Sequence, residues 1–138
     1  MICETGIIPE ASPDLKSAPV GGRTILLVED EVSVREIAAH MLAASGHKVL
    51  PAGDAIEAES LFMSHWVEID LLLADMILPG ATGLELYKKF KKRKSGLQGI
   101  IVSGSLEEDC ELSDDIMFLQ KPYRMSTLIK KVNGIFEK

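Results

Sequence analysis

The sequence has few cysteine and aromatic residues and contains no long hydrophobic run. Its two cysteines, Cys3 and Cys110, show neither CxxC nor histidine spacing, so nothing indicates a zinc site, and we treat both as bystanders. No apolar stretch approaches the length of a membrane span, and the first residues lack the basic and apolar regions of a signal peptide. We therefore expect no membrane span and a cytoplasmic location.

Charge and composition narrow the class of protein further. The formal net charge of -6 argues against general nucleic-acid binding, and we expect no direct DNA binding. Of the 138 residues, 46% are hydrophobic and 26% are charged, as is typical of a globular domain with one core. Residues 1–22 are rich in proline, glycine and small polar residues, which predicts a flexible tail or linker. The folded domain is then residues 23–138.

Apolar runs of strand length alternate along the domain with segments of helical period. Strands are expected at 24–28, 48–51, 71–75, 99–102 and 116–119. Helices are expected at 34–45, 55–65, 83–94 and 126–137. Pro51 favours an edge position for the second strand. Such alternation predicts an α/β fold, in which a parallel sheet with right-handed crossovers is covered by helices on both faces.

Capping residues mark the expected helix starts. Ser33 is a candidate N-cap for the first helix, with Glu36 as its capping-box partner, and Asp54 is a candidate N-cap for the second. Gly83 opens the third helix. The segment 106–115 is acidic and only weakly periodic, so we expect at best a short helix there.

Polar residues stand where four of the predicted strands end. Glu29 and Asp30 follow the first strand, and Asp75 ends the third. Ser103 and Lys121 follow the fourth and fifth strands. Because parallel strands have their carboxyl ends at one edge of the sheet, where ligands of open α/β sheets bind, these five side chains are expected to converge.

The chemistry of this set indicates phosphoryl transfer. Carboxylates brought close together repel one another and need a counter-charge. A hard cation such as Mg2+ prefers carboxylates, water and phosphate oxygens, and no histidine or cysteine lies nearby to suggest zinc. Lys121 adds a fixed positive charge and Ser103 a hydroxyl donor. Asp75 would then act as a carboxylate nucleophile that forms an aspartyl-phosphate.

Four stretches of the sequence resemble the receiver (REC) domain of two-component response regulators. They read ILLVEDE at 25–31, DLLLADMILPG at 70–80 followed by Gly83, VSG at 102–104, and FLQKP at 118–122. The resemblance covers residues 23–138 in order. It implies a flavodoxin-like (CheY-like), doubly wound five-stranded parallel sheet with strand order 2-1-3-4-5.

The resemblance also implies the roles of the acidic residues. Asp75 would accept a phosphoryl group from a histidine kinase or a histidine phosphotransfer protein. Asp30 and Asp75 would bind Mg2+ together with the backbone carbonyl of Ile77, and Glu29 would assist through a water molecule. Because Ile77 is bulky and apolar where the attacking water must pass, we expect slow self-dephosphorylation.

The remaining roles implied by the resemblance concern the switch. Ser103 would bond to a phosphoryl oxygen, and Lys121 would pair with the phosphoryl group. Phe118 matches the aromatic residue that changes rotamer on activation, which would alter a surface read by a downstream protein. The bond between Lys121 and Pro122 is expected to be cis.

Two departures from the family pattern affect the expected context. The segment between Ser103 and Lys121 is short and acidic, which predicts a short or irregular fourth helix. The sequence ends directly after the last helix, so no DNA-binding output domain is expected. A stand-alone receiver and the C-terminal receiver of a hybrid sensor histidine kinase both fit, and the linker before Ile25 favours the second.

Three alternatives remain open. The basic run Lys88–Lys94 is either an anionic-surface patch or a solvated helix end, and the second is favoured because cations stabilise helix C-termini. A phosphatase of the haloacid-dehalogenase type also forms an aspartyl-phosphate, but Asp75-Met76-Ile77 lacks the second acid of its Asp-x-Asp pair. A receiver-like interaction scaffold that is never phosphorylated would require no such chemistry.

Overall fold

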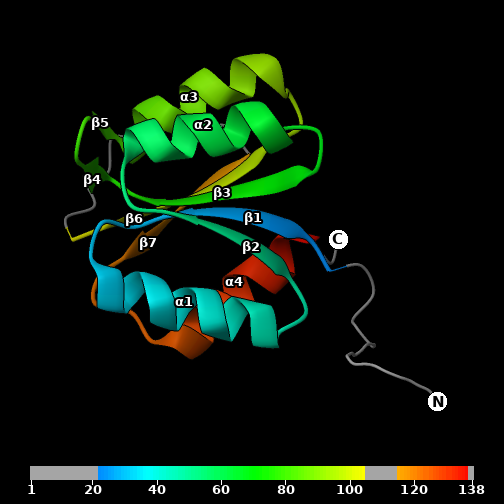
Figure 1. The fold of residues 1–138 in the computed structure, drawn as a ribbon. Coiled ribbons are helices and arrows are strands. Elements are labelled where there is room, and N and C mark those ends of the chain that lie inside the picture. Colours follow the sequence, from blue (N-terminus) through cyan, green and yellow to red (C-terminus); the bar gives the residue numbers. More distant parts are fainter. Residues whose placement is uncertain (1–21, 105–114, 137–138) are drawn as a thin grey trace, which may run out of the picture.

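A five-stranded sheet with helices on both faces forms the body of the protein (Figure 1). This computed structural model describes residues 22–104 and 115–136. The strands of the main sheet are β1 (Thr24–Val28), β2 (Lys48–Ala52), β3 (Ile69–Asp75), β6 (Gln98–Ser103) and β7 (Ile116–Gln120). The helices are α1 (Val32–Ala44), α2 (Ala55–His65), α3 (Gly83–Arg93) and α4 (Met125–Phe136).

All neighbouring strands of this sheet run parallel, in the order β2-β1-β3-β6-β7. Since β6 and β7 are the fourth and fifth strands of the sheet, the predicted order 2-1-3-4-5 is confirmed. Pro51 lies in the edge strand β2, as its missing N–H suggested. A small antiparallel pair, β4 (Ile77–Leu78) and β5 (Ala81–Thr82), was not predicted, and Gly80 with φ 96° lies in the turn between them.

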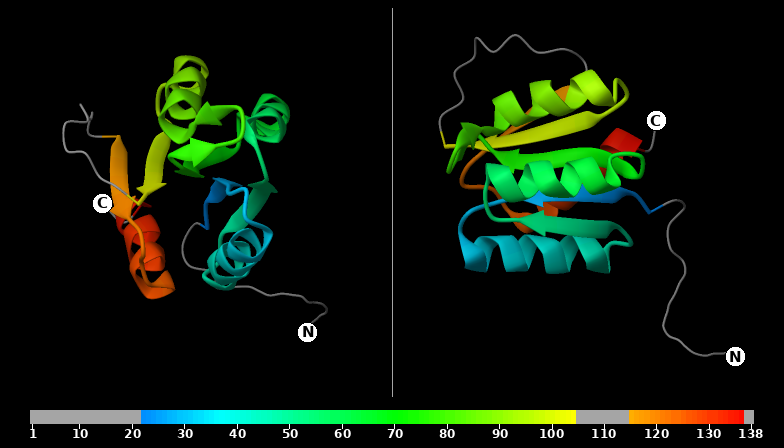
Figure 2. Two further views of the ribbon diagram at one scale, coloured as in Figure 1. Left: turned by 90° about the vertical axis from the view of Figure 1, so that its left-hand side faces the viewer. Right: turned by 45° about the horizontal axis from the view of Figure 1, so that its top comes forward.

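Alternate residues of the central strands pack on opposite faces of the sheet, where Figure 2 shows the two helical layers. Leu26 of β1 belongs to the core beneath α2 and α3, where the rings of Phe62 and Phe90 stack with centroids 4.1 Å apart. Ile25 belongs to the other core, beneath α1 and α4. Burial on both faces explains why these strands are continuously apolar.

Two helices begin with side-chain caps. The Asp54 carboxylate accepts the N–H of Glu57 at 2.8 Å and caps α2, as predicted. At the start of α3, Thr82 and Glu85 form a reciprocal capping box with two 3.0 Å hydrogen bonds. The sequence contains this capping pair, but we predicted only that α3 starts at Gly83 and did not predict the capping box.

The predicted cap of α1 is wrong. This helix begins at Val32, and the preceding residue, Glu31, makes no side-chain capping hydrogen bond. Only three residues separate β1 from α1, so Ser33 already lies inside the first turn and cannot act as an N-cap. The short connection instead keeps the acidic residues between β1 and α1 at the edge of the sheet.

The basic run at the end of α3 is largely engaged within the fold. Lys89 pairs with Glu59 at 2.9 Å, and Lys91 pairs with Asp115. The Lys94 ammonium donates to three main-chain carbonyls that follow α2, those of Trp66, Val67 and Ile69. These contacts argue against an anionic-surface patch, because the charges of Lys89, Lys91 and Lys94 are already paired with protein groups.

Some expectations fall on residues that are not described. The tail or linker was expected at 1–22, of which residues 1–21 lie outside the described residues. Most of the short helix expected at 106–115 also lies outside them. Within 22–104 and 115–136, no helix is both long enough and apolar enough to cross a membrane.

We predict that Gly99→Ala lowers the free energy of unfolding by about 1–3 kcal/mol through overpacking. A Cβ at Gly99 would lie 2.6 Å from Cδ1 of Tyr87, whose ring is fixed by a 2.8 Å hydrogen bond from its hydroxyl to the Leu97 carbonyl. Gly96→Ala is the matched control, because a Cβ there meets no atom within 4 Å. Urea unfolding measures both variants, and equal stabilities would contradict the prediction.

Candidate functional site

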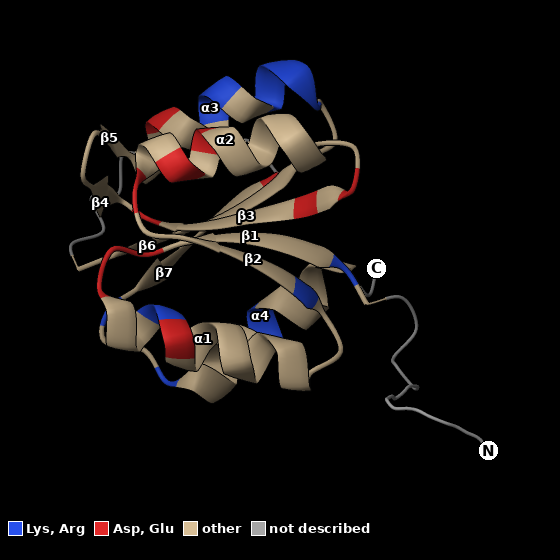
Figure 3. Cartoon of the chain, in the orientation of Figure 1, with Lys and Arg blue, Asp and Glu red and all other residues tan. Residues whose placement is uncertain are grey.

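Neighbouring strands bring polar residues to one edge of the sheet. Glu29 directly follows β1, Asp75 is the last residue of β3, and Ser103 is the last residue of β6. Lys121 directly follows β7. The acidic connection between β1 and α1 is visible in Figure 3. The sequence-predicted residues therefore lie in sheet order along the carboxyl edge.

Three carboxylates form a cluster at this edge. One carboxylate oxygen from each of Glu29, Asp30 and Asp75 lies within 4.8 Å of the others. Glu29 and Asp75 are each only 6% exposed, whereas Asp30 faces solvent. Within the described part of the chain, no other group of three potential metal ligands is this close. The cluster is therefore open to a ligand on the Asp30 side and closed by protein on the others.

Lys121 supplies the positive charge next to the cluster. Its ammonium lies 3.0 Å from Oδ1 of Asp75. Burial by itself would lower the pKa of Lys121, but the hydrogen bond to Asp75 and the charges of Asp75 and Glu29 outweigh burial and raise it. Lys121 thus stays protonated and neutralises part of the charge on Asp75.

One cation does not neutralise three carboxylates. The pKa of Glu29 is raised from 4.5 to about 7, mainly by burial and further by the charge and hydrogen bonding of Asp75. The hydrogen bond from the Glu31 N–H acts in the opposite direction and lowers this pKa. Burial and then the charges of Glu29 and Asp75 also raise the pKa of Tyr123. Three carboxylates and one lysine leave an excess of negative charge at this edge of the sheet.

This excess charge and the oxygen donors suit a hard divalent cation. Carboxylates of Asp30 and Asp75 can bind Mg2+ directly, and Glu29 is close enough to contribute through water. No histidine or cysteine belongs to the cluster, which disfavours softer metals. The residues present therefore fit Mg2+.

Ser103 and Phe118 lie on the neighbouring strands β6 and β7. Ser103 is 9% exposed, and its carbonyl accepts the N–H of Lys121 at 2.8 Å, which ties the ends of β6 and β7 together. Phe118, opposite Ile101 in the β6–β7 ladder, is half-buried and packs against the core beneath α2 and α3. The two side chains proposed as switch residues thus lie on paired strands.

Ile77 lies just beyond the acidic cluster, in β4. Its side chain is 80% exposed, although isoleucine is usually buried. The loop around it is held by main-chain hydrogen bonds from Met76 to the Val102 carbonyl and from Gly83 to the Met76 carbonyl, both 2.8 Å long. The bond between Lys121 and Pro122 is cis, as expected.

The fold and the site together define a doubly wound α/β domain with an acidic pocket and a lysine at its switch-point edge. The family described as "Response regulator receiver domain" matches residues 25–133. The chain belongs to this family, so the resemblance noted in the sequence is confirmed.

Individual relatives agree with this assignment. The sensor kinase CckA of Brucella abortus (strain 2308) is 30% identical over 122 residues, which are 86% of this chain and 13% of CckA. The phosphate regulon transcriptional regulatory protein PhoB of Pseudomonas aeruginosa is 28% identical over 125 residues, 85% of this chain and 53% of PhoB. The solved receiver domain of the hybrid histidine kinase CckA has a TM-score of 0.73 at 35% identity, covering 83% of this chain and 99% of that domain.

Two residues that lie around the cluster were not predicted from the sequence to belong to the site. Tyr123 follows Lys121 by two positions, and its aromatic type after a strand gave no distinct signal. Arg35 donates from Nη1 to the main-chain carbonyl of Glu29 at 2.7 Å. On the helical pattern alone, Arg35 reads as an ordinary polar residue, because its partner is a carbonyl rather than a carboxylate.

Proposed function

We propose that this domain accepts a phosphoryl group on Asp75 from a phosphohistidine, either of a histidine kinase or of a histidine phosphotransfer protein. The observation that carries the proposal is the buried Asp75 carboxylate, paired with Lys121 at 3.0 Å beside two further carboxylates. A carboxylate oxygen of Asp75 attacks phosphorus, the O–P bond forms and the P–N bond to imidazole breaks. The imidazole leaves and takes up a proton.

The acidic cluster would hold Mg2+ for this reaction. Asp30 and Asp75 are the proposed carboxylate ligands, with the backbone carbonyl of Ile77 and, through water, Glu29. Bound Mg2+ offsets negative charge on the phosphoryl oxygens. Lys121 pairs with the same oxygens after transfer. The closeness of the three carboxylates supports this proposal, because Lys121 offsets only one of their charges.

Phosphorylation would switch a protein-binding surface. It adds nearly two negative charges and three acceptor oxygens at Asp75. The Ser103 hydroxyl moves toward these oxygens, and Phe118 turns inward into the space that opens. The surface around β6, β7 and α4 then changes, and a downstream protein reads the change.

We further propose a cytoplasmic phosphorelay component without direct DNA binding, either the receiver of a hybrid sensor kinase or a single-domain regulator. The similarity to the receiver of CckA supports the first context, and the similarity to PhoB shows that related receivers occur in regulators. The chain spans 13% of CckA and 53% of PhoB, so the activities of those whole proteins are not carried over.

The phosphoacceptor is tested with Mg2+ and acetyl phosphate. We predict that the wild type gains the mass of one phosphoryl group and that Asp75→Asn gains none, because the amide cannot act as the nucleophile. Asp70→Asn is the matched control, since Asp70 lies near the opposite end of the same strand and accepts the Thr24 N–H. Intact mass spectrometry reads the adduct. An adduct that does not depend on Asp75 would refute Asp75 as the acceptor, and no adduct at all would favour the interaction scaffold.

Ile77 is predicted to prolong the phosphorylated state. In Ile77→Asn the amide can hold an attacking water molecule, so the phosphoryl half-life should shorten several-fold. Ile56→Asn, which changes a residue 78% exposed on α2 against 80% for Ile77, is the control. Phosphate release after removal of excess acetyl phosphate measures both half-lives. A half-life that is unchanged in Ile77→Asn would contradict this role.

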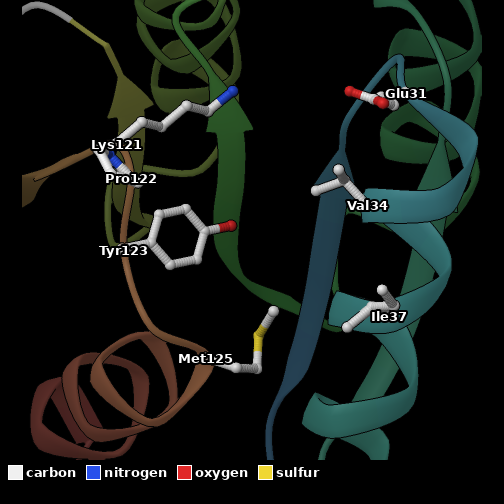
Figure 4. Close-up of a pocket in the computed structure, with 7 residues that line it drawn as sticks. All are labelled: Glu31, Val34, Ile37, Lys121, Pro122, Tyr123 and Met125. Atoms are coloured by element: carbon white, nitrogen blue, oxygen red, sulfur yellow. The ribbon is translucent and has the colours of Figure 1, made fainter.

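A groove beside the site offers a docking place for the phosphoryl donor. Its volume is about 520 Å³, and α1 and the segment after β7 form its walls. Figure 4 shows Val34 and Ile37 of α1 facing Tyr123 and Met125 across it, with Lys121 near one end. We propose that the helix carrying the phosphohistidine packs into this groove, which would bring the imidazole to Asp75.

Ile37→Asp should therefore slow transfer from a phosphorylated histidine phosphotransfer protein by about tenfold or more, the effect expected for a buried contact worth at least 1.4 kcal/mol. Phosphorylation by acetyl phosphate should be unchanged, because that small donor needs no groove. Met63→Asp on α2 is the control, since Met63 and Ile37 are both 56% exposed. Equal slowing by both variants would contradict the location of the docking groove.

A further inference from the structure

Arg35 of α1 holds the main chain at the acidic cluster. Its Nη1 donates a 2.7 Å hydrogen bond to the carbonyl of Glu29. Glu29 also makes two hydrogen bonds to main-chain groups. Its N–H donates to the Ala52 carbonyl, and its Oε2 accepts the Glu31 N–H, both at 3.0 Å. Substitution of Arg35 therefore removes the side-chain hydrogen bond that holds the Glu29 carbonyl.

Gly53 leaves the room that the Arg35 guanidinium occupies. A Cβ at Gly53 would lie 3.0 Å from Nη1 and 3.6 Å from Cζ of Arg35. The Gly53 N–H donates to the Glu57 carboxylate at 2.8 Å, so this loop is itself held in place by α2. The guanidinium therefore fills a fixed space between α1, the end of β1 and the loop after β2.

The Glu29 carbonyl belongs to the peptide group that leads into Asp30. Fixing the carbonyl oxygen restricts the plane of that peptide, and with it the position of the Asp30 Cα, from which the side chain leaves the backbone. Asp30 is exposed, yet a carboxylate oxygen of it lies within 4.8 Å of those of Glu29 and Asp75. Its place in the cluster therefore depends on the backbone.

We propose that Arg35 is a positioning residue that sets the Mg2+ affinity of the site by holding the Glu29–Asp30 peptide. This inference rests on the proposed function, in which these carboxylates bind Mg2+. Removing a cation near the cluster would by charge alone strengthen Mg2+ binding. Loss of the hydrogen bond to the Glu29 carbonyl weakens it, because the ligands are no longer pre-oriented. The two effects have opposite signs, so one measurement separates them.

The experiment is a calorimetric Mg2+ titration of the full, unphosphorylated chain. We expect Arg35→Met to raise the Mg2+ dissociation constant about tenfold, as is typical for loss of a residue that orients metal ligands. Gly53→Ala should shift it in the same direction without changing any charge, because a Cβ 3.0 Å from Nη1 forces the guanidinium to shift by a few tenths of an ångström. Lys130→Met, which removes an exposed charge from α4, should leave it unchanged.

A second readout separates affinity from chemistry. The Mg2+ concentration that gives half-maximal phosphorylation by acetyl phosphate should rise in Arg35→Met, while the rate at saturating Mg2+ stays near that of the wild type. An unchanged or lower dissociation constant in Arg35→Met would overturn the positioning role. If Arg35→Met fails to fold by circular dichroism, Gly53→Ala decides alone. A wild type that binds no Mg2+ would instead refute the proposed function.

Discussion

Mutual repulsion of carboxylates at the carboxyl edge of the sheet is the constraint on which the site depends. Glu29 and Asp75 are almost fully buried, with Asp30 close to both. Burying like charges is costly unless a counter-charge is present. Lys121 meets Asp75 at 3.0 Å and supplies one such charge, which leaves the cluster with a net negative charge. This negative charge comes from residues at the ends of β1 and β3.

The apolar sheet is what keeps these charges together. Its central strands are covered on both faces, so their ends cannot move apart without exposing two cores. The start of α3 is fitted equally closely, because a Cβ at Gly83 would lie 2.3 Å from the Asp75 carbonyl oxygen. Only glycine permits that approach. Gly83, noticed in the sequence as a helix start, is therefore required for the backbone position of Asp75.

The convergence of the site was predictable because it follows from long apolar runs that end on polar residues, as at Asp75, whereas the strand order came from the family resemblance. The start of α1 was not predictable, because whether Glu31 or Ser33 precedes the helix depends on how tightly the chain turns after β1. The contact of Arg35 with the Glu29 carbonyl could not be predicted either. A side chain that bonds to a carbonyl leaves no charge pattern in the sequence, and its contact becomes apparent only when α1, β1 and the loop after β2 are placed together.

Helix α1 unites two parts of the proposed mechanism. Arg35 reaches inward to the carbonyl of Glu29, and Ile37, two residues further on, lines the groove on the outer side. In the proposed mechanism the same helix therefore contacts the phosphoryl donor and orients the ligands of the metal site. Both proposed roles depend on how α1 is placed against the sheet.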